Sequence, residues 1–220
     1  MAATRHDQDP PPRPFPRELL AEDTLDAARA LLGARLVRDA DGSGTARRVG
    51  RIVEVEAYVG EDDRASHARM GPTPRNRVMF GPPGIAYVYL VYGMHHCLNV
   101  VTGASPFPAA LLVRAVEPVE GIDAMRLARE ARGRRPVPDM RLAAGPGLVG
   151  LAFGLDRSFT GLDLCDGASA LRLESAPDDA AVPDIVTTPR LGIAYAGEPW
   201  VSVPWRFLVA GSPSVSGGAH

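Results

Sequence analysis

The sequence predicts a single α+β domain. Segments with strand patterns alternate with a few amphipathic helical segments, and neither an internal repeat nor an interior linker divides the chain. The chain has 220 residues, of which 45% are hydrophobic and 23% charged, as is typical of a soluble globular protein. A chain of this size buries roughly 70% of its unfolded surface, which is enough for one substantial core.

Three segments have helix signals. The first can be capped by Asp23 or Thr24 and ends at Gly33, a common helix stop. Its apolar residues recur at the spacing of one helix face. The predicted helices cover residues 22–33, 119–132 and 147–155.

Strand signals are found in six further segments. They cover residues 35–38, 48–58, 85–92, 96–102, 110–116 and 207–209. A turn is predicted at 41–44, and Gly93-Met94-His95 is predicted to join the third and fourth strands in a hairpin. Residues 60–84 contain many glycines, prolines and arginines, which predicts an irregular loop.

Both ends of the chain have the composition of tails. Residues 1–17 are proline-rich and polar, which predicts a disordered N-terminal tail. Residues 212–220 are rich in serine and glycine and predict a loose C-terminal tail. The folded domain is therefore expected to span residues 18–211.

Charge and cysteine content narrow the class of protein. The net charge of −2 does not by itself indicate nucleic-acid binding, although a local basic face is compatible with it. The two cysteines, Cys97 and Cys165, are too few for a disulfide scaffold or a cysteine zinc site and indicate a reducing compartment. No apolar run approaches the ~20 residues of a membrane span, and no signal peptide opens the chain, so a cytoplasmic protein is expected.

The sequence contains no lysine: all 24 residues in the Lys+Arg count are arginine. Mechanisms that need a lysine amine, such as a side-chain Schiff base or a Walker-type phosphate loop, are therefore excluded.

Residues 51–58 place acidic side chains on one strand face. Side chains alternate between faces in a strand, so Glu54, Glu56 and Tyr58 point the same way. One interpretation is a solvated strand edge. The other is a hydrolytic site, because a carboxylate among apolar and aromatic groups has a raised pKa and can accept a proton from water.

The hairpin segment gathers three of the five tyrosines. Tyr87 and Tyr89 share a strand face, and Tyr92 lies on the opposite face before the turn glycine. These rings can pack in a core, or they can stack on and wedge between flat rings. His95 and His96 point to opposite faces and no third ligand follows at a usual spacing, so no metal site is expected.

Arginines are concentrated in the loop at 60–84. Arg64, Arg69, Arg75 and Arg77 suit contacts with phosphate groups. The alternative is a solvated loop whose arginines pair with the acidic residues at 61–63.

In this order, the segments resemble the alkyladenine (3-methyladenine) DNA glycosylase family from about residue 18 to residue 216. The resemblance rests on GRIVEVEAYVG at 50–60, SHAR at 66–69, TPRNRVMFGPPG at 73–84, YVYLVYGMHHCLNVVTG at 87–103, LLVRAVEPVEG at 111–121, AGPG at 144–147, LGIAYAGEPW at 191–200 and PWRFLVAGSPSVS at 204–216. It implies a curved, mainly antiparallel sheet flanked by helices, with a protruding hairpin. It also implies a base excision repair enzyme that flips damaged purines out of double-stranded DNA and hydrolyses their N-glycosidic bonds.

The resemblance further implies roles for single residues. Glu56 would activate the hydrolytic water, and Arg114 would hold that water and the nearby backbone. Tyr92 would fill the gap that the flipped base leaves, and Asn99 would crowd the exocyclic amine of guanine. The implied base pocket consists of Tyr58, His67, Tyr89 and Asn99. The implied contacts with the DNA backbone are Arg69, Arg75, Arg77, Met94 and His95.

Further expectations concern the reaction and its alternatives. Without a side-chain amine, the enzyme is expected to leave an abasic site and to lack lyase activity; neither a metal nor another cofactor is expected, and the protein is expected to be a monomer. Leu148 departs from the usual family pattern, which commonly has lysine there, and His95 stands where many relatives have another aromatic residue. A hydrolase of free modified nucleosides and a catalytically silent module that binds damaged DNA are the alternative functions.

Overall fold

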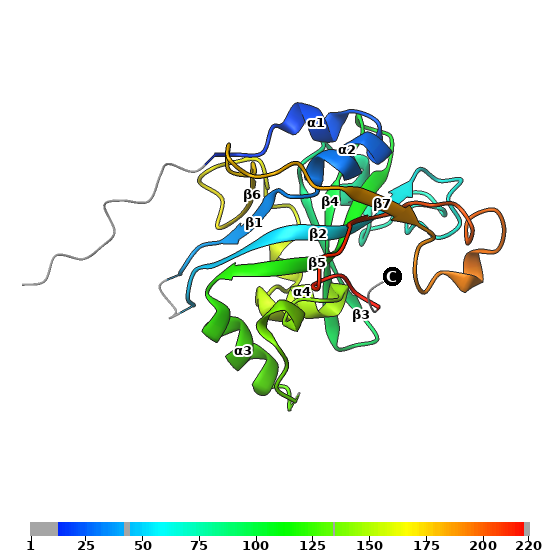
Figure 1. Cartoon of the computed structure of the whole chain (residues 1–220). Coiled ribbons are helices and arrows are strands. Elements are labelled where there is room, and N and C mark those ends of the chain that lie inside the picture. The colour runs from blue at the N-terminus through cyan, green and yellow to red at the C-terminus, as the bar shows by residue number, and fades with distance from the viewer. Residues whose placement is uncertain (1–12, 42–44, 134, 218–220) are drawn as a thin grey trace, which may run out of the picture.

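A curled antiparallel sheet forms the centre of the molecule (Figure 1). The structure is a computed structural model that describes residues 13–41, 45–133 and 135–217. The strand order is β3-β4-β5-β2-β1-β6, and β8 pairs with both β2 and β7. The strands are β1 (Arg35–Arg38), β2 (Arg48–Val59), β3 (Ala86–Val91), β4 (His95–Val101), β5 (Ala109–Glu120), β6 (Leu171–Glu174), β7 (Ile185–Thr188) and β8 (Arg206–Val209). The predicted α+β class with a curved antiparallel sheet is confirmed.

The two longest strands, β2 and β5, pair along the middle of the sheet with bulges. Glu54 lies opposite Ala115 and Val55 opposite Val113, so Arg114 has no residue directly across from it. A bulge bends a strand, increases its twist and re-aims the side chain of the extra residue. The bulges thus account for part of the curl and set the direction of Arg114.

Helices cover both sides of the sheet. They are α1 (Arg17–Ala21), α2 (Thr24–Leu31), α3 (Ile122–Glu130) and α4 (Pro146–Ala152). Figure 1 shows α1 and α2 on one side and α3 and α4 on the other. The three predicted helices are confirmed with shorter bounds, and α1 was not predicted. In the described part of the chain, no helix is long and apolar enough to cross a membrane.

Two glycines allow α4 to pack closely on the hairpin strand β4. A Cβ on Gly150 would lie 2.0 Å from the carbonyl oxygen of His96, and a Cβ on Gly147 would lie 2.9 Å from Cγ of His95. Any larger residue would therefore separate the helix from the strand. This packing supports the hairpin from one side.

The hairpin itself turns on three residues, Tyr92, Gly93 and Met94, between the paired residues Val91 and His95. Tyr92 and Gly93 have positive φ, 51° and 70°, and the amide of Met94 donates to the carbonyl of Val91. Positive φ at two successive positions is typical of the tight turns that suit the twist of a hairpin. The turn lies one residue earlier than predicted, so Tyr92 is part of the turn and stands at its tip.

The ends of the domain differ from the predicted tails. Phe15 is buried and α1 begins at Arg17, so ordered structure starts before residue 18; residues 1–12 lie outside the described residues. The C-terminal tail predicted from residue 212 is not loose over Ser214, Val215 and Ser216, which are buried. Three of the four residues of the predicted turn at 41–44, namely residues 42–44, also lie outside the described ranges.

Candidate active site

Glu56 lies in β2 with its side chain fully buried. Its Oε2 accepts hydrogen bonds from the Tyr58 hydroxyl at 2.9 Å and from Nη1 of Arg114 at 3.2 Å, and its Oε1 accepts the amide of Leu191 at 2.7 Å. A carboxylate has about four acceptor positions, and three are used here. The solvated-edge interpretation of this strand face is therefore wrong.

Glu54 is also buried, but its carboxylate is saturated. Oε1 accepts from Nε of Arg114 at 2.9 Å, Nε of Arg206 at 2.6 Å and Oγ of Ser216 at 2.8 Å. Oε2 accepts from the amide of Ser216 at 2.6 Å. The four donors leave Glu54 as a fixed counter-ion that ties the C-terminal segment to the sheet.

Arg114 bridges the two carboxylates. Burial disfavours its charge, but Glu56 and Glu54 outweigh that penalty, so the pKa of Arg114 is raised above its ordinary value. With Arg206, the two glutamates and two arginines balance to zero net charge, as a buried cluster requires. The charged state of Arg114 is thus fixed near Glu56.

A second buried ion pair holds the other side of Glu56. Arg190 and Asp63 have no exposed side-chain surface, and their contacts are 2.6 and 3.0 Å. The guanidinium also lies 4.8 Å from the Tyr58 ring centre. Arg190 directly precedes Leu191 in the chain. The ion pair between Arg190 and Asp63 therefore positions the Leu191 amide, which donates to Glu56. Burial and the neighbouring Glu56 raise the pKa of Tyr58 well above its usual value, which keeps its hydroxyl a donor.

An aromatic pocket opens beside this carboxylate. Its cavity has a volume of about 50 Å³ and is lined by Tyr58, Ala65, His67, Met79, Tyr87, Tyr89, Asn99, Ala110 and Tyr195. The rings of His67 and Tyr89 meet edge to face with centroids 4.5 Å apart. Nδ2 of Asn99 donates to the carbonyl of Tyr87 at 3.1 Å, which fixes its amide at the wall. All four residues expected in a base pocket thus line one cavity.

His67 is expected to stay neutral throughout the neutral pH range. Burial, with a contribution from Arg75, lowers its pKa to about 4, and its Nδ1 lies 3.0 Å from the Tyr87 hydroxyl. In the unfolded chain histidine titrates near 6.5, so this group favours unfolding as the pH falls from about 6.5 toward 4. NMR titration of the ring should show no midpoint between pH 5.5 and 8, with His67→Gln identifying the signal. His67 is exposed as a whole residue, so a midpoint near 6.5 would show that the surrounding pocket does not desolvate its ring.

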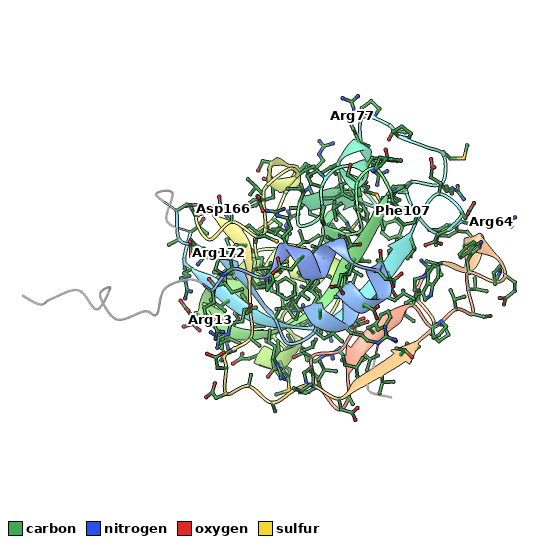
Figure 2. All side chains as sticks on the ribbon, turned by 90° about the horizontal axis from the view of Figure 1, so that it is seen from above. Arg13, Arg64, Arg77, Phe107, Asp166 and Arg172 are labelled. Atoms are coloured by element: carbon green, nitrogen blue, oxygen red, sulfur yellow. The ribbon has the colours of Figure 1, made fainter. Side chains whose placement is uncertain are left out.

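The arginine-rich loop projects from the domain. Figure 2 shows Arg64 and Arg77 pointing outward. Across the ranges that the structure describes, the four loop arginines form no ion pair, and Asp63 pairs with Arg190 instead. The alternative of internal ion pairs to residues 61–63 is thus not seen. The Arg75 guanidinium is not wholly free to contact a phosphate group, because it lies 5.3 Å from the centre of the Tyr89 ring.

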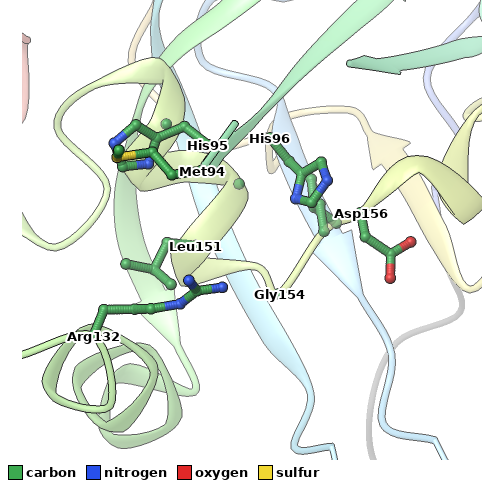
Figure 3. Close-up of a pocket in the computed structure, with 10 residues that line it drawn as sticks. Met94, His95, His96, Arg132, Leu151, Gly154 and Asp156 are labelled. Carbon is green, nitrogen blue, oxygen red and sulfur yellow. The ribbon is translucent and has the colours of Figure 1, made fainter. Parts of the chain in front are cut away.

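A second cavity lies on the flank of the hairpin. Its volume is about 560 Å³ (Figure 3). Figure 3 shows Met94 and His95 at one end of the cavity, and His96 and Asp156 at the other. Met94 is 60% exposed, and Tyr92 at the adjacent tip is 87% exposed. Met94 and His95, two of the residues expected to meet DNA, therefore line an open cavity beside the exposed tip of the hairpin. Over the described residues, no three His, Cys, Asp or Glu side chains are grouped as metal ligands would be.

Several residues of the site were not predicted from the sequence. The missed residues are Arg190, the Leu191 amide, Tyr195, Arg206 and Ser216. Tyr195 was the one with an available signal, because it is the remaining tyrosine and lies in the LGIAYAGEPW segment. The others act through contacts with residues more than a hundred positions away.

Known proteins resemble this chain over nearly its whole length. The family described as methylpurine-DNA glycosylase (MPG) matches residues 18–213. A protein of Methanocella arvoryzae is 47% identical over 92% of this chain and 95% of its own length, and one of Anaeromyxobacter dehalogenans is 48% identical over 92% and 86%. One of Bacillus cereus is 44% identical over 88% and 94%; all three are provisionally named 3-methyladenine DNA glycosylase.

These matches define the class of protein: a DNA glycosylase, a hydrolase that acts on N-glycosyl bonds in DNA. Within that class, the chain belongs to the methylpurine-DNA glycosylase family.

Proposed function

We propose that this protein is a monofunctional glycosylase of base excision repair. It flips alkylated or deaminated purines out of duplex DNA, among them 3-methyladenine, 7-methylguanine, hypoxanthine and ethenoadenine. It then hydrolyses the N-glycosidic bond and leaves an abasic site. The observation that carries the proposal is the buried Glu56 carboxylate, whose partner Tyr58 is itself a wall of the aromatic pocket.

Glu56 acts as general base in this proposal. The water oxygen bonds to C1′ of the deoxyribose, one water proton passes to Glu56, and the glycosidic bond electrons leave with the purine. A cationic alkylated purine departs as a neutral base, so it needs no acid. The ionised Glu56 also favours the cationic, oxocarbenium-like sugar of the transition state. Arg114 and Leu191 fix the carboxylate so that one acceptor position is free for the water.

The pocket selects the base that the enzyme extrudes. Extrusion costs a few kcal/mol of stacking and pairing, and least for a damaged base. Tyr92 at the hairpin tip recovers part of that cost by filling the vacated stack. Tyr58, His67 and Tyr89 enclose the purine, and electron-rich ring faces favour a cationic base. Contacts of Arg69, Arg75, Arg77, Met94 and His95 with the DNA backbone complete the proposed interface.

Asn99 is proposed to exclude normal guanine. Its amide is held against the Tyr87 carbonyl, so it cannot move aside for an exocyclic amine. Replacement by serine is expected to raise release of normal guanine about tenfold, because the shorter side chain removes the clash. Hypoxanthine lacks that amine, so its release from the same duplex should change by no more than a few-fold and serves as the control. Unchanged guanine release would refute this role.

The proposal also covers the oligomeric state of the enzyme, its compartment and the salt dependence of its DNA binding. A single domain that grips one duplex site needs no second subunit, so we expect a monomer. The thiol content suits the reducing cytoplasm, where the enzyme would act on chromosomal DNA without a metal or other cofactor. Its affinity for DNA should fall steeply with salt, since phosphate contacts release counterions.

A single-turnover assay tests the proposal. The substrate is a duplex with one hypoxanthine opposite thymine, treated with or without alkali after the reaction. Alkali-dependent strand breaks are expected, because the chain has no side-chain amine to cleave the abasic site. Breaks without alkali would indicate a lyase that uses the N-terminal amine. Methylated duplex and the free nucleosides are tested in parallel; release only from free nucleosides would favour a nucleoside hydrolase, and no release a silent binding module.

A further inference from the structure

Tyr195 is an aromatic residue of the pocket with no role so far. It lies in the short 3-10 helix η4 (Ala194–Ala196), lines the aromatic cavity and is 66% exposed to solvent. Its hydroxyl donates to the carbonyl of Ala65 at 3.3 Å, a long hydrogen bond. Its neighbours in sequence, Ile193 and Ala196, are buried, so the segment is anchored while the ring reaches the mouth of the pocket.

The cavity must enlarge before a purine can enter. Its volume of about 50 Å³ is far below the roughly 300–1,000 Å³ of typical ligand pockets. The inner wall cannot give way easily. Tyr58 is hydrogen-bonded to Glu56, Asn99 is bonded to the Tyr87 carbonyl, and Tyr87 is buried. His67 and Tyr195 are the exposed residues of the wall. His67 is held by a 3.0 Å contact with the Tyr87 hydroxyl and Tyr195 only by the 3.3 Å bond to Ala65, so Tyr195 is the wall residue that moves most easily.

The segment that carries Tyr195 is also tied to Glu56. The Leu191 amide binds the Glu56 carboxylate, and Arg190 is locked to Asp63. Only three residues separate Leu191 from Tyr195. A base that contacts the Tyr195 ring is therefore located relative to the carboxylate by a short, anchored piece of chain.

We infer that Tyr195 is a base-positioning residue that swings aside to admit the flipped purine and then stacks on it as the outer wall of the pocket. The inference rests on the proposed function, since it requires a flipped purine. Stacking on an aromatic side chain suits any purine, because every base has a π-face. Tyr195 therefore contributes to capture of the base, and the chemistry at C1′ stays with Glu56.

The test compares Tyr195→Ala and Tyr195→Phe with Leu127→Ala. Leu127 on α3 has the same exposed fraction, 66%, and lies outside the site. Loss of the ring should lower kcat/KM for hypoxanthine release about tenfold, mainly through KM, because the flipped base loses its aromatic stacking partner. The phenylalanine variant keeps the ring and should stay within about twofold of wild type, as should the leucine control.

A second measurement follows the base itself. Duplex with an ethenoadenine, whose emission changes on unstacking and restacking, is titrated with the Glu56→Gln protein with and without Tyr195→Ala. The alanine is expected to reduce the emission change at saturating protein. Unchanged kcat/KM and emission in the alanine variant, or an equal loss in the phenylalanine variant, would overturn the inference. The wild-type protein is assayed first, and its failure to release a purine from any duplex would refute the proposed function. The variants are compared only after that, so they test the role of Tyr195 separately.

Discussion

Replacement of Glu56 by glutamine is expected to abolish detectable purine release while binding of damaged duplex changes by no more than a few-fold. Glutamine has nearly the same shape and can still accept the Leu191 amide, so the pocket keeps its walls. It cannot take a proton from water and carries no negative charge near the cationic sugar. A lost general base typically costs ~10²–10⁴ in rate. Single-turnover release and equilibrium binding on the same hypoxanthine duplex measure the two effects.

The matched control is Glu117→Gln. Glu117 lies on β5, next to strand β2, and forms a partly exposed pair with Arg51 near the ends of these two central strands. Its loss removes one carboxylate from the same sheet without touching the pocket, so release should stay within about twofold. A Glu56→Gln protein that retains release within tenfold of wild type would remove Glu56 from the mechanism. Loss of both release and binding would make Glu56 a structural residue instead.

Local sequence signals accounted for most of the sheet. The alternating pattern of 48–58 and the glycine of the hairpin fix strands and a turn through nearest neighbours alone. The last two residues of β5, Val119 and Glu120, were instead predicted to begin a helix. That strand continues to Glu120 because its backbone pairs with β2 as far as Val49, which lies opposite Glu120. Glu117 and Glu120 add ion pairs with Arg51 and Arg47 across the sheet. Such cross-strand pairs depend on a register that the sequence does not display.

The candidate site was predictable only in part, for a related reason. Alternation correctly placed Glu56 and Tyr58 on one face, but it could not distinguish a solvated edge from a buried carboxylate. That distinction depends on the Leu191 amide, which is 135 residues away, and on the bulge that aims Arg114. Family resemblance supplied the pocket residues, and the distances between them came only from the fold.

The C-terminal segment shows most clearly that contacts distant in sequence cannot be predicted from local composition. Serine and glycine content predicts a loose tail, because such residues bury little apolar surface. Ser216 is nevertheless buried, since its amide and hydroxyl satisfy Glu54. Arg141 adds two hydrogen bonds, to the carbonyls of Pro213 and Val215. Buried charges need polar partners, and here the backbone of a serine- and glycine-rich segment provides several of them.

Asp63→Asn is expected to give the largest loss of stability, about 3–5 kcal/mol, because it leaves the Arg190 guanidinium buried without a counter-ion. Purine release should fall as well, since Arg190 places the Leu191 amide on Glu56. Urea unfolding followed by circular dichroism gives the free energy, and single-turnover release gives the activity. Asp26→Asn, which breaks the exposed pair with Arg29, should cost no more than about 0.5 kcal/mol.

The double variant Asp63→Leu with Arg190→Leu separates charge burial from packing. Removing both charges abolishes the unpaired cation, so the double variant should be more stable than Asp63→Asn. Recovery should be incomplete, because the Asp63 carboxylate also accepts the amides of Val59 and Ala65, which leucine cannot replace. Activity should stay low, since the Leu191 amide has lost its anchor. A single variant that costs less than 1 kcal/mol, or a double variant that regains full activity, would show that this ion pair does not hold the carboxylate in place.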